Sequence, residues 1–130
     1  MSDTSPDLDA FVLRYIDAYN SGDIESIIAM IGDPQVRHAA GETVIHTAAQ
    51  TRARIEGFYV VYSSMQFRPV VMVSRGDMVS LTWNATFTTV SSEATAGERT
   101  ELSSIEVFRI EAGRIVEVWN AKESLAHFPV

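Results

Sequence analysis

The feature of this sequence that most restricts its fold is a regular alternation of apolar and polar residues over positions 79–88. The apolar positions are Val79, Leu81, Trp83, Ala85 and Phe87, and the polar positions are Ser80, Thr82, Asn84, Thr86 and Thr88. Successive side chains of a strand point to opposite faces of its sheet. The stretch therefore predicts one long strand of a sheet with a single buried face.

Further strands are predicted on both sides of this one. The predicted elements are a strand over 66–73, a turn over 74–77, a polar connection over 91–97, and two final strands over 99–110 and 114–120 around a turn at 111–113. Pro69 lacks a backbone N–H, so it indicates an edge strand or a bulge. The second half of the chain thus predicts a meander of long antiparallel strands.

The first residues show the spacing of amphipathic helices instead. Ser5 and Pro6 begin a helix that ends at 20–22, and its apolar residues recur every three or four positions at Leu8, Phe11, Val12, Tyr15, Ile16 and Tyr19. Asp23 caps a second helix, which residues 32–34 stop and whose apolar stripe is Ile24, Ile27, Ile28 and Ile31.

A hairpin and a third helix are predicted next. Residues 36–47 form short extended pieces around Gly41, with strand candidates at Val36, His38, Val44 and His46. Thr47 and Gln50 have the spacing of a capping box, which begins a helix whose stripe is Ile55, Phe58, Tyr59 and Tyr62. Three helices followed by a meander predict an α+β fold.

Length and charge limit the classes of protein that fit. The chain has 130 residues, so we expect one domain over 1–130. Its net charge is −7 with one lysine, which argues against nucleic acid as a partner. Residues 1–9 lack the pattern of a signal peptide and no apolar run is long enough for a membrane span, so we expect a cytoplasmic protein without membrane contact.

The chain contains no cysteine, and its histidines lack metal-ligand spacing. Phosphate-loop, dinucleotide and nucleophile-elbow motifs are also missing. We therefore expect no metal and no cofactor.

Three segments resemble a known family. They are 14–23 (Arg-Tyr-Ile-Asp-Ala-Tyr-Asn-Ser-Gly-Asp), Phe58-Tyr59 and 105–110 (Ile-Glu-Val-Phe-Arg-Ile). With the order of elements, they resemble the ketosteroid isomerase and SnoaL-like polyketide cyclase branch of the nuclear transport factor 2-like superfamily, over nearly the whole chain. The resemblance implies a cone-shaped barrel, made of a curved, mixed and mainly antiparallel sheet wrapped by three N-terminal helices.

The resemblance also implies a catalytic site. Tyr15 falls on the tyrosine that donates a hydrogen bond to the substrate oxygen, and Tyr59 on a tyrosine that supports it. Glu106 falls on a carboxylic acid that an apolar site keeps neutral, so that it too donates. His38 falls on the proton-shuttling base, where the family has aspartate. The alignment near His38 leaves Arg37 or His46 as alternative occupants of the pocket.

These side chains suit proton transfer at carbon, which needs a base near an acidic C–H and donors near the oxygen that gains charge. Candidate substrate-binding residues are Trp83, Phe87, Trp119, Phe67, Met65 and Asn120. Asn120 lies near a position where SnoaL-like cyclases carry an acid, and an amide cannot act as a base there.

The leading hypothesis is a cofactor-independent isomerase or cyclase that acts on a small hydrophobic carbonyl compound, steroid-like or polyketide-like, through an enol or enolate. The alternatives are a non-catalytic module that binds small molecules and an enzyme that opens or hydrolyses epoxides. A homodimer is expected through an outer sheet face that carries Ile105 and Val107.

Overall fold

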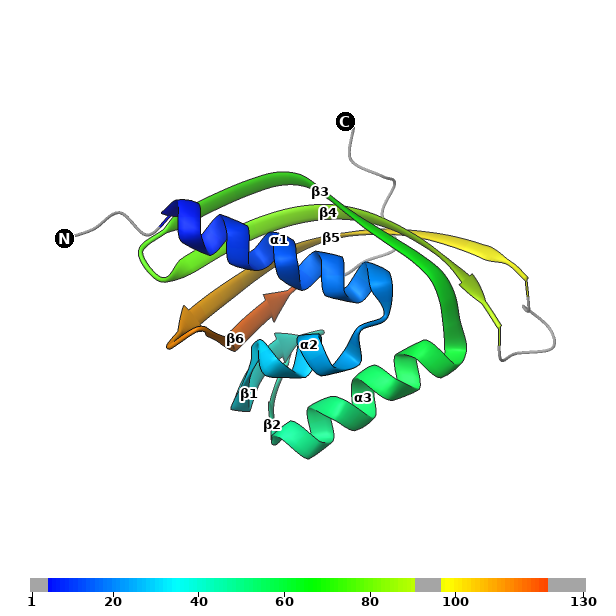
Figure 1. Cartoon of the computed structure of the whole chain (residues 1–130), viewed down its shortest axis with the longest axis horizontal. Helices are drawn as coiled ribbons and strands as arrows, with labels where there is room; N and C mark the ends of the chain where they lie inside the picture. Colours follow the sequence, from blue (N-terminus) through cyan, green and yellow to red (C-terminus); the bar gives the residue numbers. More distant parts are fainter. Residues whose placement is uncertain (1–4, 91–96, 122–130) are drawn as a thin grey trace.

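The structure is a computed structural model that describes residues 5–90 and 97–121 (Figure 1). Over these residues it contains three helices and six strands. They are α1 (Ser5–Ser21), α2 (Ile24–Ala29), β1 (Ile31–Ala39), β2 (Glu42–His46), α3 (Ala48–Val61), β3 (Tyr62–Arg75), β4 (Met78–Thr89), β5 (Arg99–Glu111) and β6 (Arg114–Asn120). None of the described helices is long and apolar enough to cross a membrane.

The strands form one curled sheet in the order β2-β1-β6-β5-β4-β3. Neighbouring strands are antiparallel except β1 and β6, which run parallel. The helices precede the long strands, and α1 lies across one face of the sheet (Figure 1). The predicted fold class is confirmed: α+β, with a curved, mixed and mainly antiparallel sheet. The sheet curls without closing on itself, because β2 and β3 remain as its edges.

The predicted capping residues Asp23 and Thr47 form the N-caps of α2 and α3. At the start of α2, the side chain of Asp23 accepts a hydrogen bond from the backbone N–H of Ser26 at 3.2 Å. At the start of α3, the Gln50 N–H donates to Thr47 Oγ1 at 3.2 Å, and the Thr47 N–H donates to Gln50 Oε1 at 2.9 Å. These contacts satisfy N–H groups that a first turn leaves unpaired.

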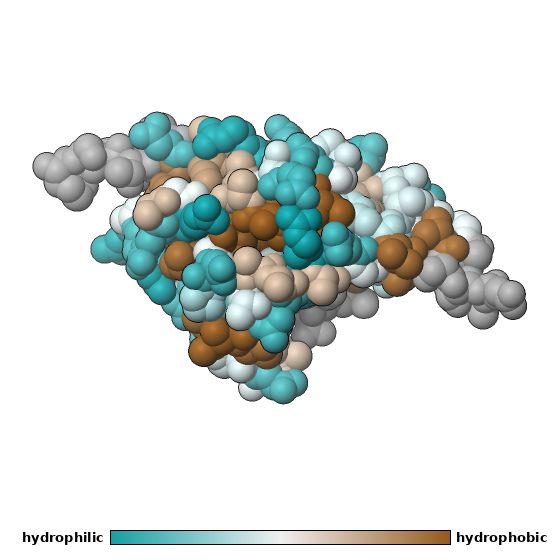
Figure 2. Space-filling model, turned by 60° about the horizontal axis from the view of Figure 1, so that its bottom comes forward, coloured by the Kyte–Doolittle hydropathy of each residue, from teal (hydrophilic) through white to brown (hydrophobic). Residues whose placement is uncertain are grey.

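The core lies between the helices and the inner face of the sheet. The helices contribute the buried side chains of Val12 and Ile16 from α1 and Ile55 from α3 to this core. The sheet contributes inward side chains such as Leu81 and Phe108. Viewed from the side of α3, the surface is mostly hydrophilic with several separate apolar patches (Figure 2).

The second helix is shorter than predicted. It ends at Ala29, and Ile31 with residues 32–34 belongs to strand β1. The Ile115 N–H donates to the Met30 carbonyl at 2.7 Å, and Ile31 pairs with Ile115 in the parallel ladder. Pairing with a strand some eighty residues away thus overrides the local helical stripe, a non-local contact that periodicity does not reveal.

The strand predicted over 66–73 is longer in the structure, where it spans Tyr62–Arg75 as β3. Strand β3 begins at Tyr62, directly after α3, so Tyr62 ends the helix and opens the strand. Pro69 was predicted to mark an edge strand or a bulge, and the structure shows both. Strand β3 is an edge strand, and its register with β4 shifts between Pro69 and Val71. A second register shift lies between Ser63 and Gln66. Most of the predicted polar connection over 91–97 lies outside the described residues.

Candidate functional site

A cavity of about 220 Å³ lies between α1, α3 and the inner face of the sheet. Aromatic and aliphatic side chains form most of its wall, and its charged residues are Glu106, Arg37 and Arg54. Pockets for drug-sized ligands span about 300–1,000 Å³. This cavity therefore suits a small ligand with an apolar body and a few polar groups.

Glu106 is the carboxylate of this cavity. The Trp83 indole Nε1–H donates to Glu106 Oε1 at 2.7 Å, and the Asn120 amide Nδ2 donates to Glu106 Oε2 at 2.6 Å. The sheet register explains the contacts, because Glu106 pairs with Asn120 on β6 and with Leu81 on β4, two residues before Trp83. Side chains two apart on a strand share a face.

Both hydrogen bonds point toward the carboxyl group. An indole N–H can only donate, and so can the amide nitrogen. The contacts of Glu106 therefore suit a carboxylate, because both of its oxygens accept a hydrogen bond from the protein.

Tyr15 faces the same cavity from α1. Its ring is 7% exposed and makes edge contacts with Tyr19 and Phe108, at centroid distances of 5.1 and 5.8 Å. Burial, followed by the nearby Tyr19 and Glu106, raises the pKa of the Tyr15 phenol well above its usual value. Tyr15 therefore keeps its proton at neutral pH and can act as a hydrogen-bond donor.

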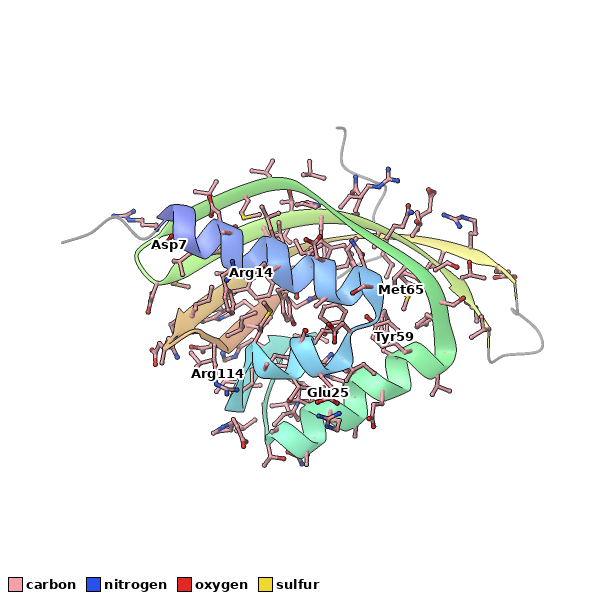
Figure 3. All side chains as sticks on the ribbon, viewed as in Figure 1. Asp7, Arg14, Glu25, Tyr59, Met65 and Arg114 are labelled. Atoms are coloured by element: carbon pink, nitrogen blue, oxygen red, sulfur yellow. The ribbon has the colours of Figure 1, made fainter. Side chains whose placement is uncertain are left out.

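Tyr59 supports α1 in a different way from the one predicted. Its hydroxyl donates to the backbone carbonyl of Tyr19 at 2.6 Å, four residues beyond Tyr15. Figure 3 shows Tyr59 on α3, on the side that faces the end of α1. Burial raises its pKa above the usual value. Tyr59 thus holds the last turn of α1 and not the Tyr15 hydroxyl.

His38 does not face the cavity. Its Nε2–H donates to Glu117 Oε2 at 2.6 Å, its Nδ1 lies 2.8 Å from Thr43 Oγ1, and its ring stacks on Trp119 at 5.2 Å. Arg37 lines the cavity, and the next residue of a strand points to the opposite face. The structure therefore corrects the placement of His38 beside Tyr15 and Glu106.

His38 belongs to a separate groove on the outer face of the sheet. This groove has a volume of about 360 Å³, and Trp119, Ile105 and Val107 line it too. Trp119 is consequently not a wall of the inner cavity. The homodimer expected through Ile105 and Val107 stays a prediction for this outer face.

The other predicted contact residues divide between wall and core. Trp83, Phe87, Phe67 and Asn120 line the cavity, whereas Met65 is buried in the core and lies outside the cavity wall. Of the two alternatives near His38, Arg37 lines the cavity and His46 does not.

Sequence analysis missed Arg54. It lies on α3, lines the cavity, and its Nε and Nη2 are buried without a hydrogen-bond partner among the described residues. Its spacing gave a usable signal, since Arg54 precedes Phe58 by four positions and shares its helix face.

A model of the SnoaL-like domain family matches residues 12–118. No curated protein matches the chain. Among solved structures, AclR, a candidate hydroxylase from Streptomyces galilaeus, is 22% identical with a TM-score of 0.77, over 88% of this chain and 87% of its own. A candidate polyketide cyclase from Xanthomonas campestris pv. campestris is 20% identical with a TM-score of 0.76, over 88% and 89%. An LEH-like epoxide hydrolase from M. tuberculosis is 14% identical with a TM-score of 0.77, over 93% and 86%. At these identities the likeness to solved structures shows the fold alone.

Proposed function

Because the chain belongs to the SnoaL-like domain family, we propose that it is a cofactor-independent enzyme that moves a proton on a small hydrophobic carbonyl compound. The observation that carries the proposal is the carboxylate of Glu106, which two N–H donors hold inside an aromatic cavity. Such a fixed carboxylate beside apolar walls suits a general base. The similarity to a candidate polyketide cyclase supports the same type of reaction.

Glu106 takes the proton from the carbon next to the substrate carbonyl. The C–H bond breaks, its electron pair forms the C=C bond of an enolate, and the π pair of the carbonyl moves onto the oxygen while Glu106 becomes a carboxylic acid. The Tyr15 hydroxyl donates a hydrogen bond to this oxygen, where the charge develops. Glu106 replaces His38 as the base, because His38 lies on the outer face.

Two outcomes are available to the enolate. Return of the proton from Glu106 to a different carbon gives an isomerase. Attack of the enolate carbon on a second carbonyl forms a C–C bond and gives a cyclase, with the proton of Glu106 going to the new alkoxide. Both outcomes share the first step, so the test addresses that step.

The experiment measures hydrogen–deuterium exchange at the carbon next to the carbonyl, by NMR in D₂O, over a panel of small cyclic and aryl ketones. We expect the protein to accelerate exchange for at least one ketone. Glu106→Gln keeps the shape of the side chain but removes the base, so exchange falls by about 10²–10⁴-fold. Glu101→Gln makes the same change on an exposed part of β5 and serves as the matched control.

Two results would contradict the proposal. The first is a Glu106→Gln variant that exchanges the ketone as fast as the unmodified protein. The second is binding of the ketones without any exchange above buffer, which would favour the non-catalytic binding module instead.

A further inference from the structure

The cavity holds two arginines for a single carboxylate. We propose that its substrate carries a permanent carboxylate group, which the guanidinium of Arg54, with Arg37 beside the same cavity, binds while the carbonyl end meets Glu106. This inference rests on the proposed function and names the substrate class as small keto acids with an apolar body.

Arg54 presents an unused pair of donors. Its Nε and Nη2 are buried and have no hydrogen-bond partner among the described residues. These two nitrogens form one edge of the guanidinium plane, the edge that receives both oxygens of a carboxylate in a bidentate contact. Guanidinium is always charged, and a buried charged donor without a partner is costly. A carboxylate in the cavity would satisfy both N–H groups at once.

Two other arginines of the chain form ion pairs with carboxylates. Arg52 of α3 binds both oxygens of Glu25 at 2.7 and 2.9 Å, and Figure 3 shows Glu25 on the side of α2 that faces α3. Arg109 contacts Glu117 at 3.0 Å. Neither Arg37 nor Arg54 forms an ion pair with a carboxylate of residues 5–90 or 97–121. Arg52 and Arg109 thus have carboxylate partners, whereas the two arginines of the cavity wall have none among the described residues.

Glu106 does not neutralise these arginines by direct pairing. Its two oxygens already accept hydrogen bonds from Trp83 and Asn120. Counting formal charges, the cavity wall carries two positive groups and one negative group. The whole chain has a net charge of −7, so the wall has a sign opposite to that of the molecule. One anionic group on the ligand would balance this local charge.

The positive charge of the two arginines also affects the pKa of His46. Its Nδ1 is buried without a hydrogen-bond partner among the described residues. Burial, then the charge of Arg54 and then that of Arg37, lowers the pKa of its ring. Both arginines therefore lower the pKa of the same ring, and no carboxylate of the described residues is among the causes that act on it. An anion bound by the arginines would offset their effect on the ring.

The test compares two probes of the same size and shape, of which one is charged and one neutral: 3-phenylpropanoate and 3-phenylpropanamide. Calorimetric titration gives the affinity of each at neutral pH and constant ionic strength. We expect the acid to bind at least ten times more tightly than the amide. A bidentate contact between charged groups contributes about 10–100-fold to affinity, so Arg54→Gln should remove most of this preference. Arg52→Gln, on the same helix but paired with Glu25 and not part of the cavity wall, should leave it unchanged.

A second readout separates anion binding from general loss of structure. In NMR titrations, the acid should raise the pKa of His46, while the amide should leave it where it is. Arg54→Lys keeps the positive charge but loses the planar edge, so we expect an intermediate preference for the acid. Circular dichroism shows whether each variant is folded. If Arg54→Gln does not fold, the loss of acid preference is measured on Arg54→Lys instead.

Equal binding of acid and amide to the unmodified protein overturns the inference, as does no measurable binding of the acid at millimolar concentration. An acid preference that survives in Arg54→Gln overturns it as well. Failure of the proposed function looks different: the acid preference is then present and depends on Arg54, but ketones show no exchange that depends on Glu106.

Discussion

The contact between Trp83 and Glu106 positions the proposed base, and its free energy can be measured directly. Trp83→Phe keeps an aromatic ring in a site that is 6% exposed but removes the indole N–H that donates to Glu106 at 2.7 Å. A hydrogen bond to a charged group contributes about 1.5–3 kcal/mol to stability. The smaller ring also leaves a void, which costs on the order of 1 kcal/mol.

The variant should therefore lose about 2.5–4 kcal/mol of unfolding free energy. The entropy of unfolding is about 2.1 cal/mol/K per residue, so 1 kcal/mol corresponds to roughly 4 °C for a domain of this size. We expect Tm to fall by about 9–15 °C. Urea denaturation followed by circular dichroism gives the free energies, and calorimetry gives Tm.

A double-mutant cycle separates the hydrogen bond from the void. Glu106→Met removes the acceptor at similar side-chain length, and the combination with Trp83→Phe should be less destabilising than the sum of the two by about 1.5–3 kcal/mol. The same cycle with Glu101→Met, an exposed residue of β5, should be additive. Additivity within about 0.5 kcal/mol for the Glu106 cycle would refute the contact and the site built on it.

Three further predictions concern stability. Gly57→Ala should raise Tm by a few degrees, because Gly57 lies inside α3 with open space around an added methyl group. Gly32→Ala should cost about 1–3 kcal/mol of unfolding free energy, because its methyl group would meet neighbouring atoms at 3.1 Å. A lower Tm for Gly57→Ala or a higher one for Gly32→Ala in calorimetry would contradict this pair. Thr47→Ala removes one half of the capping box and should cost about 0.5–2 kcal/mol in urea denaturation, and an unchanged midpoint would show that the cap does not stabilise α3. The hydrogen bond from His38 is the main cause that lowers the pKa of Glu117, so this group stabilises the fold above its ordinary value of 4.5 and loses that contribution as the pH falls through its lowered value. Urea midpoints measured below pH 4.5 should accordingly drop less for Glu117→Gln than for the unmodified protein, and identical slopes would count against the contact.

Local signals in the sequence were sufficient for most of the fold. The alternation over 79–88 placed β4, and the pair Thr47 and Gln50 placed the start of α3, because strand periodicity and helix capping involve residues close together in the chain. The end of α2 was wrong for the opposite reason. Ile31 continues the helical stripe, yet its partner in the sheet is Ile115, and no local pattern reports that contact.

The site was predicted in part. Tyr15 and Glu106 line the same cavity, and the family resemblance places both of them in one site. His38 was misplaced because a shift of one residue moves a strand side chain to the other face, and the alignment there allowed Arg37 equally well. Arg54 was missed because a charged residue on a helix is ordinarily read as solvent-exposed. Its neighbours Ile55 and Phe58 on the apolar face were the available clue.

Strand β3 also bears on how molecules of this protein behave at high concentration. An unbroken edge of 14 residues carrying the exposed Val71 and Val73 would offer a template on which a second chain could add as a strand and begin a fibril. The two register shifts divide that edge into short lengths, and Pro69 has no N–H to contribute. An incoming strand therefore meets an interrupted row of donors and acceptors, which protects the molecule from aggregation along its longest open border.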